Sequence, residues 1–355
     1  MTALNVQIEG TRNRDVVVVG AGIIGLSLAL ALNDRGAEVT VLDRWRSLTG
    51  ASIAAAGMLA AEDPCNPLEL LSLSRLSIER YPSFLRQVET LSGTHVPFQT
   101  ERTLQSMADG STIRLPEHSI DPRQLAVALR AAIASTPIEL MEETQIASVE
   151  NSLRETKIRL ASGVTIAARS VVFAAGAWTS EAMMAFGEEP VHITPRKGQM
   201  LRVRLPSGLA LNEVRRNERV YIVPRTHGPQ AGTALIGATV EDAGFDTDVH
   251  KEDLDALRAL AAKLVPALGP TADAPMVESW AGLRPATPDL LPALGACVGD
   301  RTHAGRFVAS GHYRNGILLA PATAAVMADL IEGKAPSVDL AALSPLRFSA
   351  PVMHR

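Results

Sequence analysis

The stretch Asp15-Val-Val-Val-Val-Gly20-Ala-Gly22-Ile-Ile-Gly25-Leu-Ser-Leu-Ala-Leu30 decides the fold expected for this chain. Its pattern predicts a buried strand, a glycine turn and an apolar helix. In such a unit Gly20 permits the tight turn, Gly22 lets the backbone approach a pyrophosphate, and Gly25 lets the helix pack closely on the strand. The N-terminus of the helix supplies free N–H groups and a partial positive charge. The stretch therefore predicts the phosphate-binding unit of a dinucleotide cofactor.

A second predicted strand, residues 39–42, ends at Asp43, where a carboxylate can accept hydrogen bonds from a ribose diol. The same charge would repel a cofactor that carries a 2′-phosphate, but it does not separate NAD from FAD. A structural turn without a ligand is the simpler interpretation of a glycine motif. The complete context of strand, turn, helix, strand and acid favours a cofactor site.

The composition is that of a soluble globular protein with a large core: 355 residues, of which 46% are hydrophobic and 20% charged. The net charge of −4 provides no basic field for nucleic acid. Cys65 and Cys297 form no CxxC pair, so neither a disulfide framework nor a cysteine zinc site is expected. Residues 1–14 lack the apolar core of a signal peptide, and apolar runs such as residues 26–32 are too short to cross a bilayer. These features predict a cytoplasmic protein that spans no membrane.

Further along the chain, predicted helices alternate with predicted strands, which indicates an α/β fold. Helices are expected over residues 67–89, 123–135, 251–264 and 321–331. Asp121 is the expected N-cap of the second helix, with Pro122 in its first turn. Residues 164–167 and 170–173 are expected as separate strands. From about residue 190 to 275 short β-like segments stand between Pro and Gly, which predicts a second domain.

Two segments rich in small residues are candidates for contact with a flat ligand. The first is Thr49-Gly-Ala-Ser52-Ile-Ala-Ala55-Ala56-Gly57-Met58-Leu59, although an ordinary alanine-rich helix or loop has the same composition. The second, Ala174-Ala175-Gly176-Ala177-Trp178, follows a predicted strand at the sheet edge where nucleotides bind in such folds. An ordinary strand-to-helix turn is the alternative for this second segment.

Four motifs stand in one order along the chain. They are Gly20-x-Gly22-x-x-Gly25, Phe173-Ala-Ala-Gly176-Ala-Trp178, Gly282-Leu-Arg284-Pro285 and Gly311-His-Tyr-Arg314-Asn-Gly316. With these motifs the chain resembles the D-amino-acid oxidase family of FAD-dependent oxidoreductases over nearly its whole length. Ala55-Ala-Gly57-Met58-Leu59 and Pro195-Arg-Lys-Gly198-Gln-Met200 make it most similar to the glycine oxidase branch, which serves thiamine biosynthesis.

The resemblance implies a Rossmann-like FAD-binding domain that is discontinuous, covering residues 1–85, 119–188 and 278–340. A smaller, β-sheet-rich substrate domain would cover residues 86–118 and 189–277. The FAD is expected to be non-covalent, because Cys297 precedes the Gly311 segment instead of lying in it. The family also implies a homo-oligomer.

The reaction implied by the resemblance is the oxidation of a small amino acid, glycine in the first place, or sarcosine or a small D-amino acid. The substrate would lose a hydride to flavin N5, and its imine would hydrolyse to a 2-oxo acid and ammonia. O₂ would take up the electrons and become H₂O₂.

Arg284 and Arg314 match positions that bind the substrate carboxylate in the family, and Arg314 is favoured. Arginine suits a carboxylate because it can donate two parallel N–H bonds. Tyr221 could share the carboxylate, although a half-buried strand aromatic is an equally good interpretation. Tyr313 is a candidate to flank the pocket. His312 is expected to have a structural or flavin-edge role, because the family mechanism needs no strong side-chain base.

The remaining predicted site residues would contact FAD. Backbone N–H groups at the start of the last helix would face the flavin N1–C2=O edge, where negative charge develops on reduction. The expected cofactor contacts are Gly20, Gly22, Ile23, Ile24, Gly25, Asp43, Arg44, Ser52, Ala55, Ala56, Gly57, Met58, Val149, Ala175, Gly176, Trp178, Gly311, His312, Asn315, Gly316, Ile317 and Leu318.

Four alternatives stay open at this point, of which one is another substrate: proline, sarcosine or a D-amino acid. A dehydrogenase of the same fold would pass electrons to a quinone or a partner subunit instead of O₂. A non-catalytic flavin-binding protein would act as a scaffold or sensor, and the presence of both Arg284 and Arg314 argues against it. A nicotinamide dehydrogenase would lack the terminal Gly-His-x-Arg-Asn-Gly segment.

Overall fold

The computed structural model describes residues 11–297 and 305–349, and the predicted strand–turn–helix–strand unit is present in it. The unit consists of β1 (Thr11–Val19), α1 (Ile23–Asn33) and β2 (Val39–Leu42). β1 and β2 run parallel with Val19 beside Leu42, so the glycine turn and Asp43 lie together at the carboxyl end of the sheet. Residues 1–10, on which most of the signal-peptide prediction rests, lie outside the described residues.

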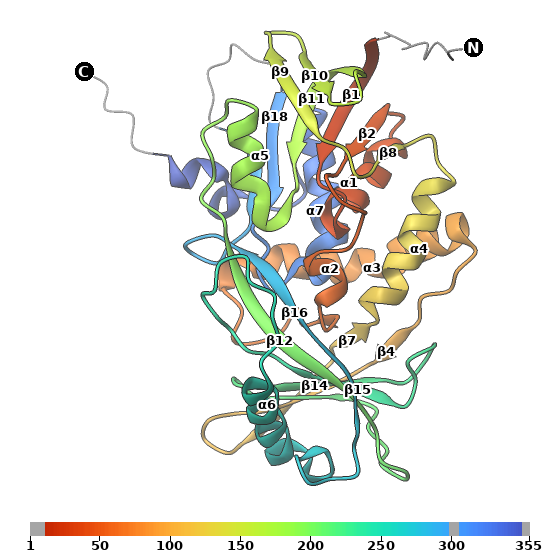
Figure 1. Cartoon of the computed structure of the whole chain (residues 1–355), viewed down its shortest axis with the longest axis vertical. Coiled ribbons are helices and arrows are strands. Elements are labelled where there is room, and N and C mark those ends of the chain that lie inside the picture. Colours follow the sequence, from red (N-terminus) through yellow and green to blue (C-terminus); the bar gives the residue numbers. More distant parts are fainter. Residues whose placement is uncertain (1–10, 298–304, 350–355) are drawn as a thin grey trace, which may run out of the picture.

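An eight-stranded sheet forms the centre of the first domain, in the order β17-β18-β11-β1-β2-β8, with β10 and β9 beyond β11 (Figure 1). Its other strands are β8 (Glu139–Met141), β9 (Ile146–Asn151), β10 (Thr156–Leu160), β11 (Thr165–Phe173), β17 (Ala293–Ala296) and β18 (Gly305–Ser310). β18, β11, β1, β2 and β8 are parallel, as in nucleotide-binding sheets. The two strands predicted at 164–167 and 170–173 are one strand, β11, because no Gly or Pro interrupts the chain between them.

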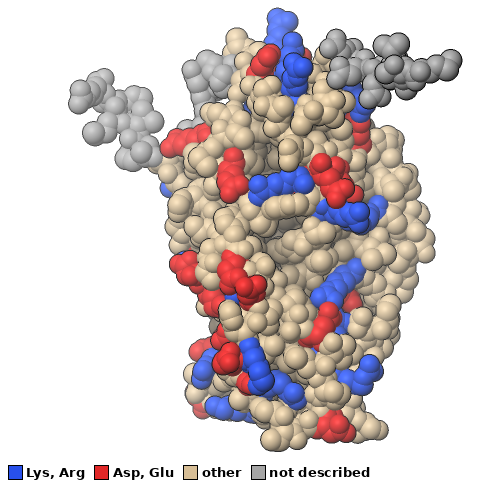
Figure 2. All heavy atoms as spheres, viewed as in Figure 1, with Lys and Arg blue, Asp and Glu red and all other residues tan. Residues whose placement is uncertain are grey.

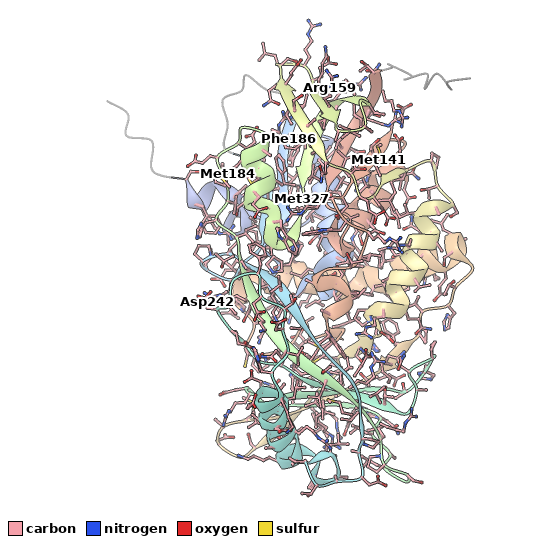
Figure 3. The ribbon with its side chains drawn as sticks, viewed as in Figure 1. Met141, Arg159, Met184, Phe186, Asp242 and Met327 are labelled. Atoms are coloured by element: carbon pink, nitrogen blue, oxygen red, sulfur yellow. The ribbon has the colours of Figure 1, made fainter. Side chains whose placement is uncertain are left out.

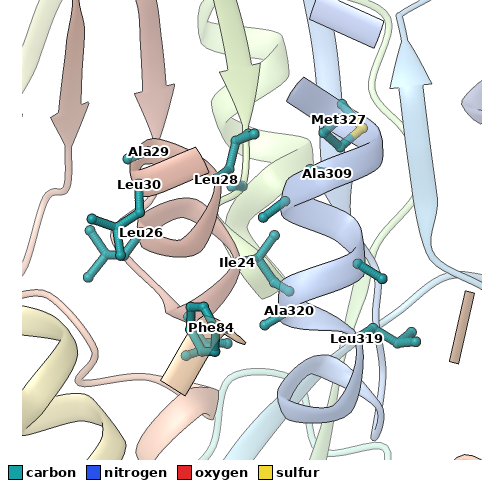
Figure 4. Packing of buried hydrophobic residues seen from close by; sticks show 14 of the residues in the cluster. Ile24, Leu26, Leu28, Ala29, Leu30, Phe84, Ala309, Leu319, Ala320 and Met327 are labelled. Carbon is teal, nitrogen blue, oxygen red and sulfur yellow. The ribbon is translucent and has the colours of Figure 1, made fainter. Parts of the chain in front are cut away.

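Helices cover both faces of the eight-stranded sheet. α1 and α7 (Gly316–Ile331) pack together on the face of Val16 and Val18, and Figure 4 shows Ile24 of α1 on the side toward α7. α5 (Thr179–Ala185) covers the opposite face, where Phe186 meets Phe173 edge-on with ring centroids 5.1 Å apart (Figure 3). α3 (Leu71–Ser92) and α4 (Pro122–Ala134) extend the layer of α1 and α7.

The ends of two helices differ in how well the sequence predicted them. Asp121 is the N-cap of α4, as predicted, and its carboxylate accepts the Arg123 N–H at 3.0 Å. α7 begins at Gly316 and not at residue 321, so Pro321 lies inside the helix. Proline cannot donate to the carbonyl four residues before it, and here the Tyr81 hydroxyl donates to the Ile317 carbonyl at 2.6 Å instead.

A seven-stranded sheet forms the second domain, in the order β16-β12-β15-β14-β13-β5-β6. Its strands are β5 (Thr103–Ser106), β6 (Thr112–Leu115), β12 (Thr194–Arg204), β13 (Val214–Arg216), β14 (Tyr221–Arg225), β15 (Thr233–Gly237) and β16 (Met276–Ala286). α6 (Lys251–Leu264) has the predicted bounds and buries Leu254 and Leu257 against this sheet.

The remaining elements are short. A three-stranded sheet contains β3 (Met58–Leu59), β7 (His118–Ile120) and β4 (Phe98–Thr100). The other helical turns are α2 (Ala51–Ala54), η1 (Leu68–Leu70), η2 (Gly176–Trp178), η3 (Pro266–Leu268), η4 (Ala341–Leu343) and η5 (Pro345–Phe348).

Two of the expected domain boundaries fall inside secondary structure. The boundary between residues 85 and 86 lies within α3. β16 pairs with β12 as far as Ala286 opposite Thr194, so residues 278–286 belong to the second sheet and not to the first domain. Gly282 and Pro285 weaken the strand pattern there, which hid the pairing from the sequence. Figure 1 shows β12 and β16 running from the second domain up to the first.

The surface has mixed charge. On the face shown in Figure 2, acidic and basic side chains are interspersed, in line with the net charge of −4. None of the helices in the described residues combines the length and the hydropathy that a membrane span needs.

Candidate cofactor and substrate site

A cavity of about 950 Å³ lies between the two domains. The first domain contributes the glycine turn, most of residues 42–58, residues 174–178 and the segment that leads into α7. The second contributes Gly198, Tyr221 and Arg284, from β12, β14 and β16. Ligand pockets commonly measure about 300–1,000 Å³, so this cavity can take a large, extended ligand.

The glycine turn has the steric features that the sequence predicted. Gly20 has a φ of +115°, and a Cβ there would lie 2.5 Å from the Ala174 carbonyl oxygen. A Cβ on Gly25 would lie 1.9 Å from the Gly20 carbonyl oxygen, so only glycine lets α1 pack this closely. A Cβ on Gly22 would meet only the Ser52 hydroxyl, at 3.5 Å, which leaves room on the cavity side.

The start of α1 and the end of β2 bring N–H donors and a carboxylate to the same rim of the cavity. Gly22 is the N-cap of α1 and provides no side-chain cap, while the Ile23 N–H donates to Ser52 Oγ at 3.0 Å. The Asp43 carboxylate accepts from the N–H groups of Ala21 at 2.7 Å and Trp45 at 2.9 Å. Burial raises the pKa of Asp43, and these two N–H groups oppose that rise. An uncapped helix start beside a fixed carboxylate suits a pyrophosphate and a ribose.

An aromatic rim continues from Asp43 toward the second domain. The guanidinium carbon of Arg44 lies 4.1 Å from the centre of the Trp45 ring. Trp45 meets Trp178 edge-on at 4.6 Å, and Trp178 stacks on Phe245 of the second domain at 5.2 Å. The rim therefore joins the two domains beside the cavity.

The segment before α7 lines the opposite end of the cavity. Asn315 is the N-cap of α7 without a side-chain cap, and Gly316 and Ile317 also line the cavity. His312 is only 2% exposed, and its Nε2 lies 3.0 Å from Thr323 Oγ1. Burial lowers the pKa of His312 to about 3, so the imidazole is neutral near pH 7. A second uncapped helix start can stabilise negative charge on a ligand in this part of the cavity.

Arg284 lies against the backbone of β12. A Cβ on Gly198 would be 2.2 Å from Arg284 Nη2, so glycine makes space for the guanidinium. Arg284 donates to the carbonyls of Lys197 at 3.3 Å and Thr239 at 3.1 Å. Burial raises the pKa of the Tyr221 hydroxyl, which the nearby Arg284 charge and a hydrogen bond to Arg284 partly offset. Within the described residues Arg284 pairs with no carboxylate, so its charge is available to a ligand.

Arg314 is differently placed. Its side chain is 43% exposed and lies 3.6 Å from the carboxylate of Asp63. It also donates to the Cys65 carbonyl at 3.2 Å and to Asn66 Oδ1 at 3.3 Å. The two arginines therefore differ in their surroundings, because a carboxylate from a distant segment already pairs with Arg314, and the preference for Arg314 stays a prediction. No local motif around residue 314 indicates that partner.

The cavity brings together most of the predicted site residues. Those that line it are Gly20, Gly22, Ile23, Ile24, Asp43, Arg44, Ser52, Ala55, Ala56, Gly57, Met58, Ala175, Gly176, Trp178, Tyr221, Arg284, His312, Tyr313, Arg314, Asn315, Gly316 and Ile317. Gly25, Val149, Gly311 and Leu318 do not line it. Val149 and Ile146 of β9 are both partly buried beside the core cluster that contains Phe173, and of the two only Ile146 lines the cavity.

Sequence reasoning missed part of the lining. Asp63, Cys65, Gln105 and Arg216 line the cavity from segments that carry no recognisable motif. Arg216 pairs with Glu117 at 3.0 Å, and Asp63 lies 3.6 Å from it as well. Cys297 is half-buried outside the cavity lining, and burial raises the pKa of its thiol to about 12. Non-covalent FAD stays a prediction.

Residues 15–115 and 108–330 match the sequence profile of the DAO family, described as FAD dependent oxidoreductase. The chain belongs to this family. The resemblance read from the four motifs is thereby confirmed, FAD is the cofactor, and a nicotinamide dehydrogenase is ruled out. The cavity fits FAD, because two uncapped helix starts and the Asp43 carboxylate surround a space of sufficient size.

The chain is similar to bacterial proteins of known name, two of which are described by their identity and coverage. The chain is 32% identical to the glycine oxidase of Geobacillus kaustophilus, over 95% of this chain and 98% of that protein. It is 35% identical to the bifunctional protein ThiO/ThiG of Trichormus variabilis over 90% of its length, and spans 52% of that protein, about half its length. A crystal structure of the Geobacillus kaustophilus glycine oxidase matches with a TM-score of 0.86 at 30% identity, covering 96% of this chain and 100% of that one. The predicted fold class is therefore confirmed.

Proposed function

We propose that this chain oxidises a small amino acid, glycine foremost and otherwise sarcosine or a small D-amino acid, to a 2-oxo acid, ammonia and H₂O₂. The observation that carries the proposal is the placement of Arg284. Its guanidinium lies in the cavity against Gly198, beside Tyr221, without a carboxylate partner among the described residues. The name of the Geobacillus kaustophilus relative, glycine oxidase, supports the same substrate class.

Arg284 binds the α-carboxylate of the substrate through two parallel N–H donors. The Tyr221 hydroxyl donates to the same carboxylate, and its raised pKa keeps it protonated and able to donate at neutral pH. Two donors on one carboxylate fix the direction in which the α-carbon points. FAD, when bound, would supply the hydride acceptor for the α-hydrogen, and O₂ would take up the electrons.

The proposal assigns no side-chain base. An amino acid that binds with a neutral amine can lose its α-hydrogen as hydride, so no residue has to remove a proton from carbon. His312 fits this scheme, because it is neutral and its Nε2 is engaged with Thr323. The resulting imine hydrolyses in water to the 2-oxo acid and ammonia.

The deciding experiment is anaerobic reduction of the purified yellow protein with glycine, sarcosine and D-alanine in separate cuvettes. Bleaching by at least one of them, followed by recovery of colour and release of H₂O₂ in air, is the expected result. Bleaching without peroxide in air would instead indicate a dehydrogenase with another electron acceptor. If no amino acid bleaches the flavin, the proposed function is wrong. Acid precipitation of the same sample is expected to release the colour, as non-covalent FAD requires.

The assembly and location of the chain are a separate matter. We propose a homo-oligomeric cytoplasmic enzyme of two domains, with β16 in the substrate domain. Gel filtration with light scattering tests the first part, because an oligomer gives a multiple of the chain mass of 37.7 kDa.

A further inference from the structure

Residues 53–56, which precede Gly57 at the cavity wall, are held from outside by three side chains. The indole N–H of Trp280 donates to the Ala54 carbonyl at 3.1 Å. Arg123 Nε donates to the Ile53 carbonyl at 3.4 Å, and Arg225 Nη2 donates to the Ala56 carbonyl at 2.9 Å. None of these three donors lines the cavity, whereas Ala54, Ala55, Ala56 and Gly57 do. The donors therefore act on the side of the segment away from the cavity.

The hydrogen bond from Arg225 to the Ala56 carbonyl also fixes the direction of the next N–H group. In a trans peptide the C=O and the following N–H lie in one plane and point in opposite directions. The Ala56–Gly57 peptide is trans, and Arg225 holds its carbonyl on the outer side. The Gly57 N–H accordingly points toward the cavity, and among the described residues no protein atom accepts it.

Gly57 is also fixed on its other side. Its carbonyl accepts the Ile120 N–H at 2.9 Å, and its φ of +85° is one that residues with a Cβ rarely adopt. A Cβ at this position would lie 2.1 Å from the Ile120 carbonyl oxygen. The N–H of Gly57 is thus a donor of fixed direction at the cavity wall.

The Arg225 side chain carries a charge although it is almost completely buried. It is 1% exposed, and its nearest carboxylate, Asp121, lies 3.7 Å from its Nε. Burial lowers the pKa of Arg225 to about 10, so the side chain is charged at neutral pH. Burying a charge costs free energy unless its contacts are good, and within the described residues the one hydrogen bond of the Arg225 side chain goes to the Ala56 carbonyl.

We propose that Arg225 is a positioning residue for FAD: by holding the Ala56 carbonyl, it directs the Gly57 N–H at a polar atom of the isoalloxazine ring. A donor aimed at the ring strengthens FAD binding and favours the reduced, more negative flavin. This inference rests on FAD as the cofactor and not on the amino-acid substrate, so its failure would leave the proposed function standing.

The test uses the holoprotein and two substitutions, Arg225→Met and Arg225→Lys. Release of FAD on dilution is followed by the rise of flavin fluorescence, and the midpoint potential is measured against a reference dye. Loss of one hydrogen bond to the ring is expected to speed FAD release about tenfold in Arg225→Met, with a more negative potential. Arg225→Lys keeps the charge and one donor and is expected to show a smaller change of at least about twofold in the same direction.

Arg258→Met is the matched control. Arg258 in α6 also holds backbone carbonyls, because its Nη2 donates to Gly269 at 2.8 Å and to Ala274 at 3.0 Å, but it does not line the cavity. It should lower the melting temperature while FAD release and potential stay within about twofold of the wild type.

The proposal is overturned if folded Arg225→Met releases FAD at the wild-type rate and potential, or if Arg258→Met changes both as much. Should Arg225→Met fail to fold, Arg225→Lys decides alone: values equal to those of the wild type overturn the proposal, and a shift in both supports it.

Discussion

The hydroxyl of Tyr81 donates to the carbonyl oxygen of Ile317 at 2.6 Å, and so connects α3 to the first turn of α7. The acceptor is the carbonyl that Pro321, lacking an N–H, leaves without its helical donor. The first turn of α7 lines the cavity through Gly316 and Ile317. A side chain from a distant helix thus lets a proline stand inside the helix that faces the cofactor site.

Replacement of Tyr81 by Phe should therefore destabilise the protein beyond the loss of an ordinary surface contact. Tyr81 is buried, so the change leaves a buried carbonyl without a partner and is expected to cost about 1–3 kcal/mol of unfolding free energy. Urea unfolding measures this. In a Pro321→Ala background the helix regains an N–H for Ile317, and the same Tyr81→Phe change should cost less. Equal costs in both backgrounds would contradict this account.

Substitutions of Arg284 and of Arg314 should lower kcat/KM for glycine to clearly different extents. Arg284→Met removes a charge that no described carboxylate shares, and kcat/KM for glycine is expected to fall about 100-fold, as loss of a charge-assisted pair of bonds predicts. Arg314→Met is the matched control, because Asp63 already pairs with that arginine. We expect a loss of less than about tenfold there. A larger loss in Arg314→Met than in Arg284→Met would restore the opposite assignment.

Gly198→Ala tests the position of the Arg284 guanidinium without replacing the arginine. The new methyl group would lie 2.2–2.5 Å from the Arg284 guanidinium, so the side chain has to move away from β12. The expected result is a raised KM for glycine with FAD still bound, since none of the predicted cofactor contacts is altered. Visible absorbance per chain reports the FAD content, and steady-state assays report KM. An unchanged KM would show that the position of Arg284 does not matter for substrate binding.

His312 should make stability depend on pH below neutrality. Its folded pKa of about 3 lies below its ordinary value of 6.5, so between these values the unfolded chain binds a proton that the folded chain does not. Stability from this group is therefore full above pH 6.5 and declines as the pH falls toward 3. Between pH 7 and 5 the decline is expected to be about 2 kcal/mol. Urea unfolding of the wild type should show a loss between pH 7 and pH 5 that exceeds the loss in His312→Gln by this amount, and equal losses would contradict the assignment.

The local signals in the sequence predicted local structure well. The glycine turn after β1, the Asp121 cap and the bounds of α6 depend on residues within one or two turns of each other, and the structure has them as predicted. The cavity-lining residues near the glycine motifs follow from the same short-range rules.

The structure differs from the sequence-based expectation where a distant residue decides the local arrangement. Tyr81 allows α7 to start before Pro321, and Asp63 pairs with Arg314, although neither partner is near in sequence. In β9 no motif gives a register, and Ile146 lines the cavity while Val149 does not. These are tertiary contacts, which periodicity and propensity do not encode.

The strand β16 fixes the spacing between three residues that build the cavity wall and the candidate substrate site. Trp280 donates to the Ala54 carbonyl in the cavity wall, Gly282 lies against Ala54, and Arg284 lines the cavity, all on one face of an extended chain. Four residues of strand separate the first from the last by about 13 Å. Because the spacing along this strand is fixed, acceptance of a bulkier amino acid would have to come from smaller side chains at other cavity-lining positions of the same sheet, such as Met200 and Tyr221, and not from moving the arginine.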